Sequence, residues 1–366
     1  MPKTPACGIN MRALVFDLGG TFLRAGIAGP GGRITEVTKA RIPSVATGDV
    51  PDAIWKHISS RIIEYESAYG VQVPQSAPIV ISFPGPIAEY RHAHQAATVA
   101  GGGPLQLDIA SILEARTGRR VILLNDVSAA AWRIAETTES RRFLVVTVSS
   151  GIGSKMFESG PNGRVIDHLA HAGEIGHVVV DDSPSAPVCD CGARGHLGAI
   201  ASGRGIERHA RQAAKQNGLA FKNSSLFQDF GATPDTITNE EHLVPAILGG
   251  DQWALEVLTS CTRPLARVLL MIAVAAGLDS VFVIGGFAQA LGNAYLDKLR
   301  RLAFEASRFE LVDASVPSLF QLAAYNAEIC LEGCGAFIAQ NVDSRMDSDP
   351  NWSSQFDLAS FKVTRG

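Results

Sequence analysis

The chain has 366 residues, of which 46% are hydrophobic and 19% are charged, and its formal net charge is −4. This length allows one large domain or two. The weak negative charge, with an isoelectric point near 6.1, gives no electrostatic reason to expect nucleic acid or a membrane as partner. Residues 1–10 lack the apolar core of a signal peptide, so we expect a cytoplasmic protein.

Strand-like and helical segments alternate in the first third of the chain. Residues 12–18 and 22–28 flank a Gly-Gly pair and predict the two strands of a hairpin. Residues 52–70 show helical spacing and end in glycine. Residues 77–85 and 119–126 predict buried strands that end in polar residues. This order of elements predicts an α/β fold.

The middle of the chain repeats the pattern of its start. Residues 15–34 align without a gap to residues 146–165, so that Gly20 meets Gly151 and GPGGR meets GPNGR. Each segment predicts a strand, a small-residue turn, a second strand and a wider turn. We therefore predict two similar α/β lobes that face one another and place both glycine turns on a common cleft.

Three other segments complete the expected organisation. Leu265 to Leu278 is the longest apolar run, too short to span a bilayer, and predicts a buried helix. Residues 216–241 are polar and indicate a helical insertion or a mobile loop. The chain after residue 340 is polar and predicts a weakly ordered tail.

Both aligned turns carry groups that can hold a phosphate. In DLGGT, from Asp17 to Thr21, two glycines bring backbone N–H groups close to an anion and the threonine adds a hydroxyl. Asp17 can hold a hydrated Mg²⁺. SSGIG, from Ser149 to Gly153, offers similar groups. A tight hairpin turn explains either segment alone, but two facing turns favour a polyphosphate. Neither is a Walker loop or a GxGxxG fingerprint.

The motif LLNDVSAAAW leads from a buried strand into an alanine-rich helix. A helix N-terminus favours the ionised form of Asp126. A carboxylate there can take the proton from an attacking hydroxyl group. A simple helix N-cap is the alternative interpretation of this stretch.

Cysteines cluster only in CDCGARGH, residues 189–196. The Cys-x-Cys spacing fits neither a thioredoxin-type pair nor a haem attachment motif. Zinc needs four nitrogen or sulfur ligands around a tetrahedron. Cys189, Cys191 and His196 supply three, and an upstream histidine is close enough in sequence to supply the fourth. The spacing favours zinc over a metal-free thiol loop.

The upstream motif AGEIGH places Glu174 and His177 three residues apart. Together they suggest binding of a hydroxylated ligand or of a metal, and a surface turn is the alternative. His177 lies twelve residues before Cys189. His168 and His171 are rival donors, so spacing alone leaves the fourth zinc ligand open.

Seven motifs in order make the chain resemble the ROK family of bacterial sugar kinases, in the actin-like ATPase superfamily. They are DLGGT, PGPI, NDVSAAA, TVSSGIG, GEIGH, CDCGARGH and VIGG, and they span about residues 12–340. The resemblance implies a two-lobed actin-like ATPase (ribonuclease H-like) fold with duplicated βββαβα lobes. We expect a small lobe at 11–122, with a helix near 323–340 as the element that completes it, a large lobe with the zinc loop at 123–322, and a polar tail at 341–366.

The resemblance also assigns residues to ligands. The nucleotide-binding residues that it implies, for ATP with Mg²⁺, are Asp17, Gly19, Gly20, Thr21, Ser150, Gly151, Gly153, Gly285 and Gly286. It implies Asp126 as the catalytic base. The acceptor-binding residues that it implies are Asn125, Asp126, Glu174 and His177. The ligands that it implies for a structural Zn²⁺ are His177, Cys189, Cys191 and His196.

Several positions depart from the family pattern. His196 replaces a third cysteine, and histidine is a competent zinc ligand. Gly198 stands where the family has a sugar-contacting glutamate, and GGGPLQLD is an unusual form of the loop that leads towards the sugar. Lys155 stands where a small or apolar residue is usual, and either reaches a phosphate or faces solvent. These departures put glucose and N-acetylmannosamine in doubt and leave an amino sugar or a C7 cyclitol as candidate acceptors.

We expect an ATP-dependent kinase that phosphorylates a primary hydroxyl of a hexose, amino sugar or sugar-like cyclitol. Asp126 would take the hydroxyl proton, Asp17 would position the metal through water, and closure of the lobes would exclude water. ATP or polyphosphate can be the donor, and a homodimer is the candidate assembly.

Two alternatives of other classes are a sugar-responsive regulator and a catalytically inactive sugar-binding protein. Only sixteen residues precede Asp17, so we expect no DNA-binding domain ahead of it. The presence of Asp126 argues against the inactive protein.

Overall fold

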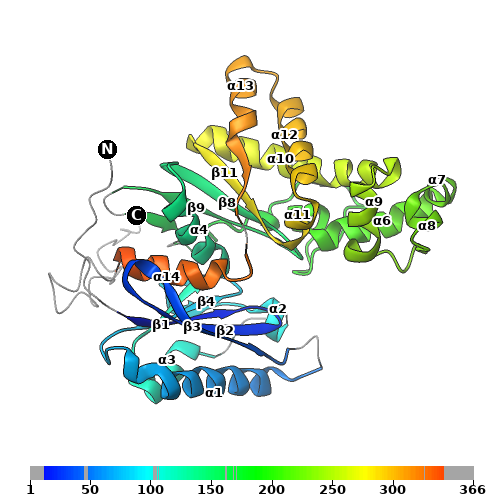
Figure 1. The fold of residues 1–366 in the computed structure, drawn as a ribbon. Coiled ribbons are helices and arrows are strands. Elements are labelled where there is room, and N and C mark those ends of the chain that lie inside the picture. Colours follow the sequence, from blue (N-terminus) through cyan, green and yellow to red (C-terminus); the bar gives the residue numbers. More distant parts are fainter. Residues whose placement is uncertain are drawn as a thin grey trace, which may run out of the picture. The chain divides into compact units, whose positions relative to one another are not determined.

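The computed structural model describes residues 12–44, 48–101, 105, 107–160, 163–167, 169, 171–324 and 326–341 (Figure 1). These residues form two compact units. Unit 1 holds the described residues up to Thr138, between Gly163 and His171, and from Asn326 onward. Unit 2 holds those between Glu139 and Asn162 and between Ala172 and Tyr325.

The core of unit 1 is a five-stranded mixed sheet with the strand order β3-β2-β1-β4-β7. Its strands are β1 (Ala13–Leu18), β2 (Phe22–Ala28), β3 (Ile34–Arg41), β4 (Ile79–Phe83) and β7 (Val121–Asn125). β1, β4 and β7 are buried along their whole length. This explains why they are mostly apolar and do not alternate regularly with polar residues.

Helices cover this sheet on both faces: α1 (Pro51–Tyr69) and α3 (Ile109–Thr117) on one, and α4 (Asp126–Thr137) and α14 (Ile329–Asn341) on the other (Figure 1). α14 packs closely on α4, because an added Cβ at Gly333 would lie only 1.8 Å from Ala129 O. Shorter elements are η1 (Pro30–Gly32), η3 (Gly70–Gln72), β5 (Ile87–Ala88), β6 (His92–Ala93) and α2 (Ala97–Ala100).

The second five-stranded sheet has the order β10-β9-β8-β11-β12, and all its strands except β10 belong to unit 2. Its strands are β8 (Arg142–Val148), β9 (Ile152–Glu158), β10 (Arg164–Ile166), β11 (Ser280–Ile284) and β12 (Phe320–Leu322). β8 pairs antiparallel with β9 and parallel with β11, as β1 pairs with β2 and β4. The predicted duplication and the α/β fold class are therefore confirmed.

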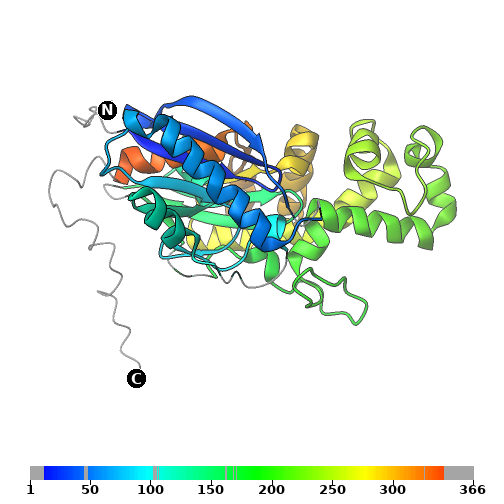
Figure 2. The same cartoon turned by 90° about the horizontal axis from the view of Figure 1, so that it is seen from below.

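Unit 2 is rich in helices. They are η4 (Ile175–His177), α5 (Leu197–Ala201), α6 (Gly203–Gln216), α7 (Gly218–Lys222), α8 (Ser225–Gln228), η5 (Asn239–Leu243), α9 (Val244–Leu248), α10 (Gln252–Ala276), α11 (Gly286–Leu291), α12 (Asn293–Ser307) and α13 (Glu310–Leu319). α6 to α9 lie together on one side of unit 2, away from its sheet, in both views (Figures 1 and 2). Residues 216–241 therefore contain a helical insertion. This was one of the two structures predicted for them.

The long helix α10 contains the predicted apolar run. By length and composition it is the one described helix that could span a membrane, but 56% of its most apolar window is buried in the protein. Leu258, Leu265 and Leu269 belong to the core of unit 2. The prediction of a buried helix holds for that face, although the helix is longer than the run that predicted it.

The chain divides at a different point from the predicted one. We expected a boundary at 122, whereas β7 and α4 belong to unit 1, which continues to Thr138. α14 occupies most of the expected 323–340 helix and also belongs to unit 1. The tail beyond residue 341 lies outside the described residues, and the common cleft for the two turns stays a prediction.

Candidate functional site

The first predicted phosphate turn, from Gly19 to Thr21, lies at the tip of the β1–β2 hairpin. Gly19 N donates a hydrogen bond to Phe22 O at 2.9 Å and so closes the turn. Gly20 and Thr21 are exposed. The tip of the turn is therefore open to a ligand.

Asp17, in contrast, is buried at the end of β1, with 6% of its surface exposed. Arg24 lies opposite it on β2, and its Nη1 donates to Asp17 Oδ2 at 3.0 Å. Burial raises the pKa of the Asp17 carboxyl, while Arg24 and Ser82 partly offset this by lowering the pKa. Carboxylate oxygen is a ligand type that Mg²⁺ accepts, but here one oxygen already binds Arg24. Sequence reasoning missed Arg24, because only the register of the hairpin, with Leu18 opposite Leu23, places it opposite Asp17.

The second predicted phosphate turn connects β8 to β9. Ser149 N donates to Gly151 O at 3.1 Å, and Ser150 is exposed. Gly153 lies within β9, where it pairs with Thr147 of β8. An added Cβ at Gly151 would meet no atom within 4 Å. The protein itself therefore leaves open space above Gly151.

The N-terminus of α6 is built directly onto this second turn. Gly203 N donates to Ser149 O at 2.7 Å, and Arg204 Nε donates to Ser150 O at 2.8 Å. An added Cβ at Gly203 would lie 2.9 Å from Ser149 O, so only glycine fits without a shift. A helix N-terminus favours a bound anion. Sequence reasoning missed these residues, although the segment SGRG at a helix start was a visible signal.

The predicted adenosine-side glycines lie beside the same turn. An added Cβ at Gly286, the first residue of α11, would lie 3.7 Å from Ser149 Oγ. Gly285 has a positive φ of 101°, and an added Cβ would lie 2.6 Å from Val148 O. Close packing against β8 therefore requires Gly285 whether or not a nucleotide is bound.

Gly151→Val tests whether the second turn holds phosphate. Since the protein leaves space for the side chain, the fold should be kept while a ligand at the turn is displaced. We expect calorimetry to show MgATP affinity about 10- to 100-fold weaker, the value of one charge-assisted hydrogen bond. Gly218→Val is the matched control, because Gly218 in the same unit also has open space at its Cβ. Unchanged nucleotide affinity in Gly151→Val would mean that the turn does not face the phosphates.

Asn125 and Asp126 lie where β7 runs into α4. Asn125 Oδ1 accepts hydrogen bonds from Val127 N at 3.0 Å and Ser128 N at 3.3 Å, and so caps the helix. Its Nδ2 donates to Gly85 O at 2.9 Å. The N-cap interpretation therefore applies to Asn125 and not to Asp126. An amide has two N–H donors, so one remains for an acceptor.

Asp126 is the first residue of α4 and is partly exposed. Its Oδ1 accepts from the adjacent Val127 N at 2.9 Å. Its backbone is held from α14, where Cys330 Sγ donates to Asp126 O at 3.5 Å. Two residues further on, Ser128 Oγ donates to Asp167 Oδ2 at 2.8 Å. A carboxylate on a well-anchored helix N-terminus is suited to remain ionised and to accept a proton.

Glu174 lies on a loop that packs against β9. Ser154 N donates to Gly173 O at 3.0 Å, and an added Cβ at Gly176 would lie 2.3 Å from Ile152 O. Glu174 itself is partly exposed. Within the described part of the chain, its carboxylate has no hydrogen-bond or ion-pair partner. It is therefore available to a ligand.

Gly198, where the family pattern has glutamate, lies on α5 against the same loop. An added Cβ would lie 3.1 Å from Gly176 O. A glutamate at this position would therefore have its Cβ next to the loop that carries Glu174.

Four predicted zinc ligands come together in unit 2. The ligand atoms of His177, Cys189, Cys191 and His196 all lie within 4.8 Å of one another. His177 Nδ1 lies 3.4 Å from His196 Nδ1 and 3.9 Å from Cys189 Sγ, and Cys191 Sγ lies 3.3 Å from His196 Nδ1. Atoms about 2.0–2.3 Å from a tetrahedral zinc are separated by about 3.3–3.8 Å. The donor types therefore fit Zn²⁺, and two of the three distances fall in this range while the third slightly exceeds it.

Two other histidines were rival candidates for the fourth ligand of this cluster. His171 is exposed and is not part of it, whereas His168 lies outside the described residues.

Lys155 is buried, so the expectation that it faces solvent is wrong. Its Nζ donates to Ala172 O at 2.6 Å, because β9 lies directly under the chain that leads to Glu174.

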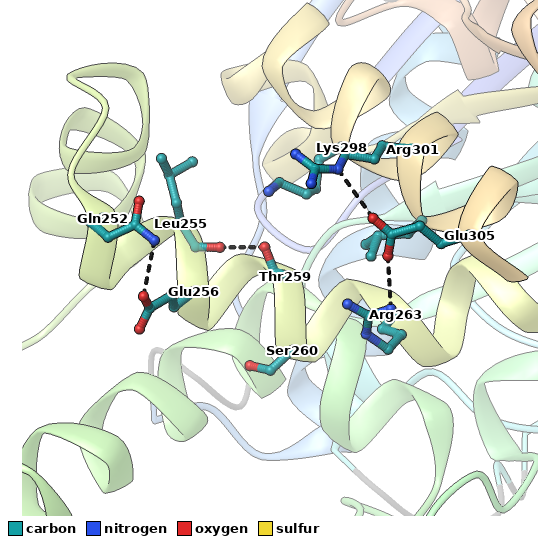
Figure 3. Close-up of a pocket in the computed structure, with 10 residues that line it drawn as sticks. Gln252, Leu255, Glu256, Thr259, Ser260, Arg263, Lys298, Arg301 and Glu305 are labelled. Atoms are coloured by element: carbon teal, nitrogen blue, oxygen red, sulfur yellow. Dashed lines mark hydrogen bonds and ion pairs between the residues drawn. The ribbon is translucent and has the colours of Figure 1, made fainter.

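A groove of about 500 Å³ lies between α10 and α12 (Figure 3). Charged residues line it, and Arg263 and Arg301 both pair with Glu305. None of the predicted nucleotide, acceptor or zinc residues lines this groove. It is therefore separate from the candidate site.

Comparison with known proteins places the chain in a family. Residues 13–318 match the ROK family. The chain is 37% identical over 340 residues to the C(7)-cyclitol 7-kinase of Streptomyces hygroscopicus subsp. jinggangensis, covering 90% of this chain and 94% of that protein. It is 28% identical over 315 residues to the 2-epi-5-epi-valiolone 7-kinase of Actinoplanes sp., covering 78% and 82%.

A solved structure supports the fold assignment. The ROK family glucokinase from Streptomyces griseus, solved with glucose and AMPPNP, matches with a TM-score of 0.65 at 21% identity, covering 88% of this chain and 98% of that one. Its likeness concerns the fold alone. The match over most of the sequence shows more: the chain belongs to the ROK family, as the seven motifs predicted.

Proposed function

We propose that the protein is an ATP- and Mg²⁺-dependent kinase that phosphorylates the exocyclic primary hydroxyl of a C7 cyclitol. The observation that carries the substrate class is the 37% identity, over 90% of the chain, to a C(7)-cyclitol 7-kinase. Gly198 supports it, because the carboxylate that contacts the sugar in the family pattern is missing beside the Glu174 loop. A C7 cyclitol presents a hydroxymethyl group like that of a hexose.

Each unit carries one glycine turn that suits a phosphate group of the nucleotide. Gly20 and Thr21 lie at an exposed hairpin tip in unit 1. In unit 2, the space above Gly151 and the N-terminus of α6 beside Ser149 suit a phosphate group. Bound Mg²⁺ would neutralise charge on the phosphates. Asp17 would hold it, through water, with the carboxylate oxygen that Arg24 leaves available.

The acceptor would be bound by Asn125 and Glu174 and deprotonated by Asp126. Asp126 would accept the hydroxyl proton on its carboxylate as the oxygen attacks the γ-phosphorus of ATP, whose bond to the bridging oxygen breaks so that ADP leaves. Asn125 would donate its remaining amide N–H to a ring hydroxyl. Glu174, whose carboxylate has no partner in the described part of the chain, would accept hydrogen bonds from other hydroxyls.

The zinc would have a structural role. Four protein ligands fill a tetrahedral shell, so a bound ion would have no open position for substrate. Because His177 and His196 both turn Nδ1 towards the cluster, His177 Nε2 stays available for an acceptor hydroxyl. A site with reduced cysteine ligands also suits a cytoplasmic location.

An acceptor panel tests the substrate class. ADP release from MgATP would be measured with a C7 cyclitol, glucose, glucosamine and N-acetylmannosamine at equal concentrations. We expect the highest kcat/KM with the cyclitol, by about tenfold or more, since a lost charged hydrogen bond costs the other acceptors that much. A higher kcat/KM with glucose or with an amino sugar would overturn the cyclitol assignment. Repeating the best reaction with polyphosphate identifies the donor.

A further inference from the structure

Lys155 on β9 is buried, with 4% of its surface exposed, two residues beyond the second glycine turn. Its Nζ donates to Ala172 O at 2.6 Å. Among the described residues it forms no ion pair. Burying an ammonium group with so little compensation is unfavourable. A methionine would fill similar space without that cost, so packing alone does not account for a lysine here.

The partner of Lys155 begins the acceptor loop, which we define as Ala172 to His177. Just beyond Ala172, both Ser154 N and Ser154 Oγ donate to Gly173 O, at 3.0 and 3.1 Å. An added Cβ at Gly173 would lie 1.8 Å from Ser154 O and 3.3 Å from Lys155 Cδ. The lysine stem therefore packs on Gly173 while its ammonium group holds Ala172.

The opposite end of the acceptor loop carries His177, whose ring nitrogen lies within 4.8 Å of the ligand atoms of Cys189, Cys191 and His196, the metal cluster. Glu174 lies between the two anchors, and its own carboxylate has no protein partner in the described part of the chain. Its position is therefore set by the backbone on either side. The charge-assisted bond from Lys155 is the stronger kind of hydrogen bond, and it fixes the side that the metal cluster does not reach.

We propose that Lys155 is a positioning residue, which orients the acceptor loop and, through it, the Glu174 carboxylate. This inference rests on the proposed function of Glu174 as an acceptor ligand. It gives Lys155 a role in acceptor specificity without any contact with the nucleotide.

Lys155→Met and Lys155→Arg test the proposal. Methionine keeps the length of the side chain but removes its charge and its hydrogen-bond donors. Arginine keeps the charge and the donors. We expect Lys155→Met to raise the acceptor KM about 10- to 100-fold, with a smaller change in kcat and no change in ATP KM or zinc content. Lys155→Arg should recover part of the loss, and Glu174→Gln should raise the same KM. The matched control is Lys215→Met, which removes an exposed lysine paired with Asp235 in the same unit.

Hydrogen exchange of the ligand-free protein gives a readout that needs no activity. We expect amides 173–178 to exchange faster in Lys155→Met than in the wild type, while amides of β8 keep their rates. If the wild type phosphorylates no acceptor, the proposed function is wrong. The exchange rates would still show whether Lys155 orders the acceptor loop.

Two outcomes would overturn the role of Lys155. One is a folded Lys155→Met variant with wild-type exchange and an acceptor KM within about twofold of wild type. The other is an equal rise in the acceptor and ATP KM values, which would make Lys155 a general structural residue. If Lys155→Met does not fold, Lys155→Gln takes its place under the same criteria.

Discussion

Asp126→Asn is expected to lower kcat by about 10²- to 10⁴-fold, the usual contribution of general acid–base catalysis. The substitution keeps the shape of the side chain and removes its basicity. It should not unfold α4, because Asn125 and not Asp126 caps that helix. Affinities for MgATP and for the acceptor should change little, since an amide oxygen can still accept a hydrogen bond.

The measurement is steady-state turnover of the variant, together with its melting temperature and both KM values. Asn125→Ala makes a useful contrast, because it removes the cap and the bond to Gly85 O. That variant should lose about 1 kcal/mol of stability or more together with activity, whereas Asp126→Asn should lose activity alone. Near-wild-type turnover in Asp126→Asn would show that another group takes the proton.

Cys191→Ser is expected to remove the zinc and to impair the acceptor side of the reaction. The wild type should contain about one zinc per chain, and the variant close to none, since a tetrahedral site needs all four ligands. Loss of the ion releases His177, which anchors one end of the acceptor loop. We expect kcat/KM for the acceptor to fall by about 10- to 100-fold.

Metal analysis and acceptor kinetics check this result, and His171→Ala is its control. His171 is exposed and lies outside the cluster, so this variant should keep its zinc. ATP affinity should change far less than acceptor affinity in Cys191→Ser, because the glycine turns use other residues. A fully active wild type without zinc would reduce the cluster to a thiol-bearing loop. Loss of zinc in His171→Ala would mean that His177 is not the fourth ligand.

Local patterns allowed most of the fold to be predicted from the sequence. The β1–β2 and β8–β9 hairpins each follow from two short apolar runs around a glycine turn. Their duplication was visible because the two turns and their flanking glycines share one register. The cysteine cluster was visible for the same reason, since three of its four ligands lie within eight positions.

The rest depended on contacts between residues far apart in the chain. Arg204 binds Ser150 O across more than fifty residues, so no local pattern links α6 to the second turn. The burial of Lys155 depends on the path of the chain at Ala172. From the sequence, the stretch with Asn125 and Asp126 could be interpreted as a helix N-cap or as the site of a catalytic base. Only the hydrogen bonds of the structure assign the N-cap to Asn125.

The position of the phosphate in the product tests the central claim most directly. The wild type would be incubated with MgATP and a C7 cyclitol, and the product examined by ³¹P–¹H correlation NMR. We predict one product whose phosphorus couples to the two protons of the exocyclic CH₂ group, with one ADP formed per phosphate transferred. Coupling to a single ring proton, or ADP formation without any phosphorylated polyol, would contradict the account.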